Sequence, residues 1–191
     1  MPDAGSWVAF ALLTPVVLIA AVTDWRVGKV YNKLTFPAIL AGLVWWTLWG
    51  FHLQGAGGAM EGFLRALVGF ASGALPFAVL YAVGGLHGGD VKLMGAVGAL
   101  TASWQAVLAT SVYAFVVGAV LAIAVMIRRG LVRRTASRIF GAALMATARV
   151  KPSFPEDSPP IPFAVGIAIG SILATAEVLL GLHTPWAAFG P

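Results

Sequence analysis

Cysteine is absent from the chain, and charged residues are scarce, at 10% of its 191 positions. Without cysteine there are no disulfides, no thiolate metal sites and no cysteine nucleophile. A soluble domain carries about 25% charged residues, so this chain has too few charges to cover a water-facing surface. Hydrophobic residues make up 60% of the sequence. The composition therefore predicts an integral membrane protein.

Long stretches of the chain contain no charged residue, and each is a candidate membrane-spanning segment. They occupy residues 7–23, 34–60, 66–89, 93–127 and 158–176. A transmembrane helix needs about 20 apolar residues. Four of the runs suit one helix each, whereas residues 93–127 are too many for a single crossing at about 1.5 Å per residue.

The positions of lysine and arginine decide how residues 93–127 fold, because these residues concentrate in short cytoplasmic loops. As a single span, the run would send the seven basic residues from Arg128 to Lys151 to the outer side. A hairpin turning near residues 101–105 keeps them inside and leaves only Arg65 of twelve basic residues elsewhere. We therefore predict an all-α integral membrane protein with six transmembrane helices. Both termini are then outside.

Residues 1–191 are predicted to form a single membrane-embedded domain with one long basic cytoplasmic loop at residues 128–160. This loop mixes arginines with apolar residues, as in a helix that lies on the inner leaflet; an ordinary connecting loop is the alternative. The net charge is +5. Because the basic residues lie in short loops between apolar runs, we assign them to membrane topology and lipid contact, and expect no nucleic-acid partner.

Two carboxylates are candidate functional groups, since a charge near a bilayer costs about 3 kcal/mol. Asp24 ends the first span and Asp90 opens the fourth, so the predicted topology puts both at one depth on the inner side. Facing carboxylates can share a proton, one then activating water while the other protonates a carbonyl. Helix capping and salt bridges to neighbouring basic residues are alternative roles. Glu61 is expected in an outer loop, and Glu177 is expected to reach the outer surface.

Three local sequences resemble the motifs of the type IV prepilin peptidase family, in the family's order. They are DWRVGKVYNKLT at 24–35, GGLHGGDVKLM at 84–94 and IPFAVGIAIG at 161–170. The family motifs are an Asp followed by basic residues and Ile-Pro-Asn-x-Leu-Thr, then Gly-x-Gly-Asp-Val-Lys-Leu, then Ile-Pro-Phe/Tyr-Gly-x-x-x-Ala-x-Gly. Tyr31 stands in place of the family's proline and His87 in place of its first glycine. His87 either tunes the acids electrostatically or is tolerated in an exposed loop.

The resemblance implies a membrane aspartic protease of the GxGD type, which removes the leader peptide from prepilin-like substrates at the cytoplasmic membrane face. It implies no metal and no other cofactor, because water and two carboxylates suffice. Glycines before the second acid would give the loop flexibility and let the substrate backbone approach. The residues carried over are the catalytic pair Asp24 and Asp90, and the substrate-binding or loop-supporting Gly88, Gly89, Lys92 and Asn32.

The resemblance also implies a multi-pass protein of the bacterial inner (cytoplasmic) membrane, whose partners are membrane lipid and a prepilin or pseudopilin with an apolar N-terminal helix. With no cysteine and a short chain, it resembles the peptidase-only members that serve tight-adherence (Flp) pili. Archaeal preflagellin peptidases are also short and stay open as an alternative. Two other functions stay open: a proton- or cation-coupled transporter using the same two acids, and an inactive pilus-assembly scaffold.

Overall fold

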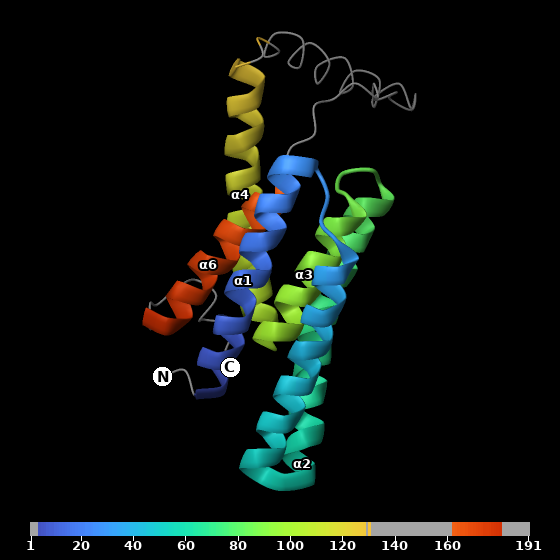
Figure 1. Cartoon of the computed structure of the whole chain (residues 1–191), viewed down its shortest axis with the longest axis vertical. Helices are drawn as coiled ribbons and strands as arrows, with labels where there is room; N and C mark the ends of the chain where they lie inside the picture. Colours follow the sequence, from blue (N-terminus) through green and yellow to red (C-terminus); the bar gives the residue numbers. More distant parts are fainter. Residues whose placement is uncertain (1–3, 129, 131–161, 181–191) are drawn as a thin grey trace, which may run out of the picture. The chain divides into compact units, whose positions relative to one another are not determined.

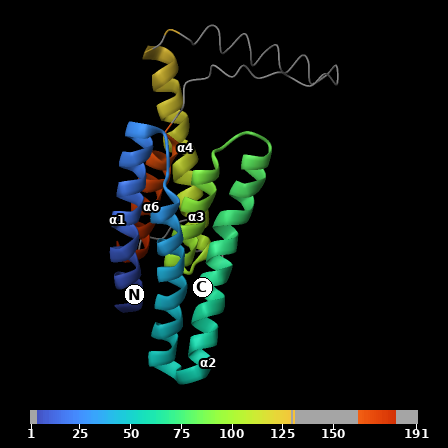
Figure 2. The ribbon, with the colours of Figure 1, turned by 45° about the vertical axis from the view of Figure 1, so that its right-hand side comes forward.

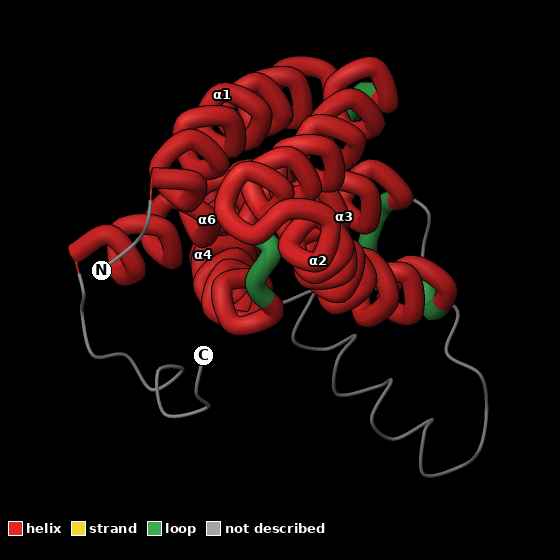
Figure 3. The backbone as a smooth tube through the Cα atoms, turned by 90° about the horizontal axis from the view of Figure 1, so that it is seen from below, coloured by secondary structure: helices red, strands yellow, loops and turns green. Residues whose placement is uncertain are grey.

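The computed structural model describes residues 4–128, 130 and 162–180, and within them it contains helices and loops but no strand (Figure 3). The prediction of an all-α protein is confirmed for these residues. They divide into two compact units, one formed by the residues up to Val117 together with those from Pro162, the other beginning at Gly118. The helices are α1 (Ala4–Val27), α2 (Asn32–Ala82), α3 (Gly88–Thr101), α4 (Trp104–Arg128) and α6 (Phe163–Leu180).

Four helices, α1, α2, α4 and α6, are long and apolar enough to cross a membrane by length and composition. The chain is thus an α-helical membrane protein. The remaining helix, α3, has 14 residues, about 21 Å at 1.5 Å per residue against a hydrocarbon core of about 30 Å. Six crossings therefore stay a prediction, as does the single domain. The predicted basic loop at 128–160 lies outside the described residues, apart from Arg128 and Gly130.

The helix α2 folds back on itself as a hairpin of two arms, visible in Figures 1 and 2. The turn lies at Gly55, whose φ of 67° is a conformation that glycine adopts readily. The arms approach closely, since a Cβ on Gly50 would overlap the carbonyl of Gly58. The expectation that Glu61 lies in the connecting loop is wrong. Glu61 belongs to the second arm, because the run of small residues at 55–58 turns the chain earlier than the first charge does.

The helix break between α3 and α4 falls where the charge distribution predicts a hairpin, within residues 101–105. Thr101 ends α3, Ala102 adopts a left-handed conformation with φ 46°, and Trp104 begins α4. The Ser103 hydroxyl accepts a hydrogen bond of 3.2 Å from the N–H of Ala106 and so caps the new helix. The first part of α4 then runs back opposite to α3 (Figure 2).

Although α3 is short, it is the buried centre of the larger unit, where it contacts α1, α2 and α6. Every residue from Leu93 to Leu100 is buried. Glycines bring α3 against the second arm of α2, because a Cβ on Gly98 would overlap the carbonyl of Gly69. This close approach is the packing that small residues permit between membrane helices.

The helix α6 packs on the first part of α4 through another small residue and a polar pair. A Cβ on Gly170 would lie 2.6 Å from the carbonyl oxygen of Thr110. About two turns further on, the Glu177 carboxylate accepts a hydrogen bond from the Tyr113 hydroxyl. Glu177 is half-buried, and its expected position near the outer surface stays a prediction.

Candidate active site

Asp24 lies in the last turn of α1 and caps a different helix. Its Oδ2 accepts a hydrogen bond of 3.0 Å from the backbone N–H of Ala164, which is 140 positions away and is the second residue of α6. The first N–H groups of a helix have no partner within it and form its positive end, which stabilises a carboxylate. The contact therefore joins the stretch that begins at Asp24 to the Ile-Pro-Phe stretch at the start of α6.

Asp90 lies in the first turn of α3 and is only 3% exposed. Its Oδ2 accepts a hydrogen bond of 3.1 Å from the backbone N–H of His87, and the Asp90 N–H donates in return to the His87 carbonyl at 3.0 Å. The His87 Nδ1 lies 4.0 Å from the same Oδ2, but the imidazole is 77% exposed. Solvent therefore weakens the side-chain interaction, and the backbone N–H is the closer contact.

The electrostatics of Asp90 link it to Asp24, which lies 66 positions earlier in the chain. Asp90 lies outside the four helices that are long enough to cross a membrane. The pKa of Asp90 is raised from 3.8 to about 6, chiefly by burial; the His87 N–H opposes this rise and the nearby Asp24 charge adds to it. Such mutual influence lets two carboxyl groups titrate as a pair.

In each of the two acids, one carboxylate oxygen accepts a hydrogen bond and the other accepts none within the described part of the chain. A backbone N–H holds Oδ2 in both, whereas Oδ1 of Asp24 and of Asp90 has no hydrogen bond within the described part of the chain. In that same part, neither acid forms an ion pair with lysine or arginine. Of the alternative roles expected from the sequence, salt bridging is thus not seen there, while capping is present but occupies a single oxygen of each carboxylate.

Lys92 and Asn32, the two polar residues predicted beside the acids, contact each other. The Lys92 Nζ donates a hydrogen bond of 2.8 Å to Asn32 Oδ1 and also lies 5.6 Å from the ring centroid of Phe36. Asn32 begins α2, and Lys92 lies in the first turns of α3. The pair therefore connects the start of one helix to the start of the other. A substrate-binding or loop-supporting role for the two residues stays a prediction.

Gly88 and Gly89 begin α3 instead of forming a loop before it, and neither has a positive φ. A Cβ on Gly89 would lie 3.0 Å from the Cβ of Val30, so its small size lets the segment between α1 and α2 approach closely. A Cβ on Gly88 would lie 3.7 Å from the ring of Tyr81, an ordinary contact. Close packing, more than loop flexibility, explains the glycine at 89.

Residues 11–123 match the type IV leader peptidase family. The match covers more than half of the chain and includes both acids, Asn32, Lys92 and the glycines between them. The chain belongs to the type IV leader peptidase family. No curated protein and no solved structure matches it. The resemblance to prepilin peptidases is thereby confirmed at the level of the family.

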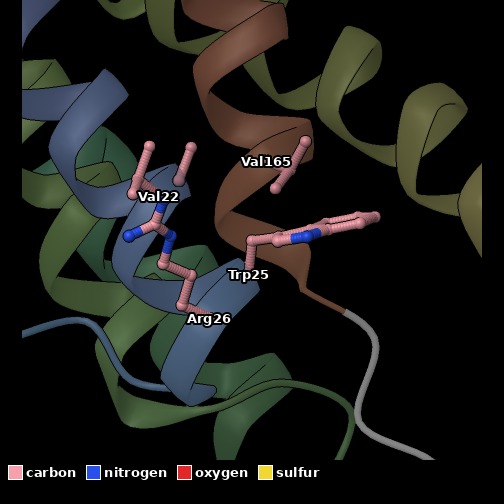
Figure 4. Close-up of a pocket in the computed structure, with 5 residues that line it drawn as sticks. Val22, Trp25, Arg26 and Val165 are labelled. Carbon is pink, nitrogen blue, oxygen red and sulfur yellow. The ribbon is translucent and has the colours of Figure 1, made fainter.

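This leader peptidase family member has an apolar groove beside Asp24, between α1 and α6. The groove has a volume of about 370 Å³ and is lined by Ala21, Val22, Trp25, Arg26 and Val165. In Figure 4 the Trp25 indole extends from α1 to the side of α6 that carries Val165. Asp24 precedes Trp25 in the sequence but is not one of the residues that line this groove.

Two features of the site escaped the sequence analysis. The Asp24–Ala164 contact joins residues at opposite ends of the chain, and only the Pro162 before α6 hinted at a helix start there. Thr35, the last residue of the first motif, is fully buried, which no local pattern indicates.

Among the described residues, no three His, Cys, Asp or Glu side chains group in a way that could hold a metal ion.

Proposed function

We propose that the protein is a membrane aspartic endopeptidase in which Asp24 and Asp90 remove the leader peptide from type IV prepilin-like substrates. The observation that carries the proposal is the convergence of two acids from α1 and α3. The charge of Asp24 acts on Asp90, and each acid keeps one oxygen without a hydrogen bond in the described part of the chain. Membership of a leader peptidase family supports the reaction class.

The chemistry follows from one shared proton. Asp90 holds this proton, in keeping with its raised pKa, and Asp24 is ionised. Asp24 accepts a proton from water as the water oxygen attacks the scissile carbonyl carbon, and Asp90 donates its proton to the carbonyl oxygen. When the tetrahedral intermediate collapses, the C–N bond breaks, the leaving amine takes the proton that Asp24 received, and one hydroxyl group of the intermediate returns a proton to Asp90. The backbone N–H groups on Oδ2 hold both carboxylates in place during these steps.

The membrane side follows from the basic residues around the pair. Arg26, Lys29, Lys33 and Lys92 belong to the helix ends and connections that carry the two acids. Because basic loops stay in the cytoplasm, the site would face the cytoplasm from the bacterial inner membrane. The substrate would be a prepilin or pseudopilin, whose apolar N-terminal helix enters the membrane beside Asp24, where the apolar groove lies.

Co-expression with a candidate prepilin, followed by a gel for leader removal, tests this proposal. Asp24→Asn and Asp90→Asn should each lower cleavage by about a thousandfold or more, because an amide is neither a base nor an acid at neutral pH. The double variant should be no worse than either single one, since residues that act as a unit are not additive. An immunoblot of the membrane fraction checks that each variant is still made and inserted.

His87→Gly is the matched control, and we expect cleavage within about twofold of the wild type. The contact to Asp90 comes from the backbone N–H of residue 87, which glycine also provides. Substantial cleavage by either single Asn variant would exclude the catalytic pair. If the wild-type protein bound the prepilin without cleaving it, an assembly scaffold would replace the peptidase as the proposed function.

A further inference from the structure

Thr35 holds a buried polar atom with no partner. The side chain is 0% exposed, and its Oγ1 is the one buried side-chain polar atom, among the residues described, that lacks a hydrogen bond. A buried hydroxyl without a hydrogen bond destabilises the folded protein, so such hydroxyls are uncommon in native structures. The groups around Thr35 indicate which partner its hydroxyl has.

The usual partner of a helical hydroxyl is already occupied at this position. Elsewhere in this chain, five helical hydroxyls donate a hydrogen bond to the carbonyl four residues earlier; they belong to Thr14, Thr47, Thr101, Ser111 and Ser171. For Thr35 that carbonyl belongs to Tyr31, which accepts the N–H groups of both Leu34 and Thr35 itself. A carbonyl oxygen has two lone pairs, so the capacity of Tyr31 is full. The Thr35 hydroxyl is left to bond elsewhere.

Three contacts place the first turn of α2 against the first turn of α3, which carries Asp90. Asn32, one turn before Thr35, accepts the hydrogen bond from Lys92. The Phe36 ring lies under the same lysine. Val30 packs on Gly89, the residue before Asp90. Thr35 and Asp90 belong to these two turns, and both are buried, at 0% and 3% exposure.

We propose that Thr35 is a positioning residue of the peptidase site, whose hydroxyl hydrogen-bonds the Asp90 carboxyl through one water molecule. This inference rests on the proposed catalytic pair. It pairs an unsatisfied donor with Asp90 Oδ1, the oxygen that has no hydrogen bond in the described part of the chain. The other groups that act on the Asp90 charge are Asp24 from α1 and His87 from the turn before α3. A hydrogen bond to a carboxylate favours its ionised form, so Thr35 would hold Asp90 in place and set its protonation.

The test compares Thr35→Val, which keeps the shape without the hydroxyl, with Thr35→Ser, which keeps the hydroxyl. Purified enzyme variants are assayed on a prepilin for kcat and KM across pH. For Thr35→Val we expect kcat to fall about tenfold or more, with KM unchanged and the alkaline limb of the pH profile moved to higher pH, because Asp90 acts in its protonated form. For Thr35→Ser we expect kcat within about twofold of wild type. A merely structural hydroxyl would leave kcat and the pH profile of the Val variant unchanged, and that result overturns the proposal.

A second comparison covers two complications. If Thr35→Val does not fold, Thr35→Ala and Thr35→Ser serve instead, because both lack the methyl group and only serine carries the hydroxyl. Equal kcat in these two variants overturns the role of Thr35 while wild-type cleavage still supports the proposed function. If wild-type protein shows no cleavage, the proposed function fails by itself. The role of Thr35 is then tested by the pH dependence of the Tm. Loss of the hydroxyl should still move the fall in Tm that Asp90 causes to higher pH. If the pH of this fall is unchanged, the role of Thr35 is overturned.

Discussion

Two effects act in opposite directions on the pKa of Asp90. Its carboxylate is almost completely buried, and burial penalises the charged form. The His87 N–H partly offsets this penalty. The outcome is a pKa of about 6, which lies in the range where a carboxyl group can act as an acid near neutral pH. The same burial that suits the residue for proton transfer makes its ionised form costly for the fold.

Asp90 should therefore make the stability of the protein depend on pH. Between pH 3.8 and about 6, the folded protein holds a proton that the unfolded chain has lost, so stability falls as pH rises through this window and stays lower above it. Asp90→Asn cannot ionise and should remove this fall, raising the Tm at pH 7 by about 5 °C. Thermal unfolding in detergent at several pH values measures the effect.

Glu61→Gln is the control for that experiment, because Glu61 is exposed and its replacement should leave the curve unchanged. A pH dependence that survives in Asp90→Asn would assign the titration to another group.

At the scale of the elements, the packing of α3 depends on glycines, which have no side chain. With 14 residues α3 is the shortest of the described helices, yet its residues from Leu93 to Leu100 are buried. Glycine-to-glycine contact with the second arm of α2 brings the backbones together. This packing holds the first turn of α3, and with it Asp90, against α1 and α2.

A single methyl group at this contact should destabilise the protein. Gly98→Ala would drive a Cβ into the backbone of Gly69, and backbone cannot move aside as a flexible side chain can. We expect a loss of about 2 kcal/mol or more of unfolding free energy, seen as a lower Tm in detergent and weaker leader cleavage.

Gly57→Ala is the matched control, since nothing lies within 4 Å of the added Cβ and its φ is not positive. It should leave both the Tm and cleavage near the wild-type values. Equal Tm values for the Gly98 and Gly57 variants would show that α3 can shift away from α2 at little cost.

At the scale of the whole molecule, both membrane topology and site assembly depend on where the charges lie. The helix ends that carry the acids also carry basic residues, including Arg26 and Lys92. Arg65, the one basic residue that the predicted topology leaves off the inner side, lies 5.7 Å from the ring centroid of Trp46. This cation–π contact gives a cation in an apolar helix a favourable partner.

Reporter fusions test the topology directly. Six crossings, with a turn at the helix break of residues 102–103, predict that a fusion after Trp104 reads as external. A fusion after Arg134 should read as cytoplasmic, because the basic residues from Arg128 onwards are then retained inside. An external signal at Arg134 would contradict six crossings and the shared membrane side of the two acids.

Much of this protein follows from its sequence alone, because the bilayer acts on local patterns. Charge-free runs define apolar helices, and the distribution of basic residues predicts the hairpin break at 102–103 that the structure contains. Asp24 and Asp90 stand out because few carboxylates lie near the ends of apolar runs. The motifs around them identify the family, which the match over residues 11–123 confirms. Their catalytic roles stay a prediction.

Only the tertiary structure decides which groups meet. Ala164 is the partner of Asp24, Asn32 of Lys92, and Tyr113 of Glu177. Each pairing joins different helices, so no periodicity or spacing within one segment specifies it. The turn of α2 at Gly55 was likewise hidden, because an apolar run does not show where glycine lets the chain reverse. Burial of Thr35 belongs here too, since it results from packing between helices whose faces the sequence alone does not match to one another.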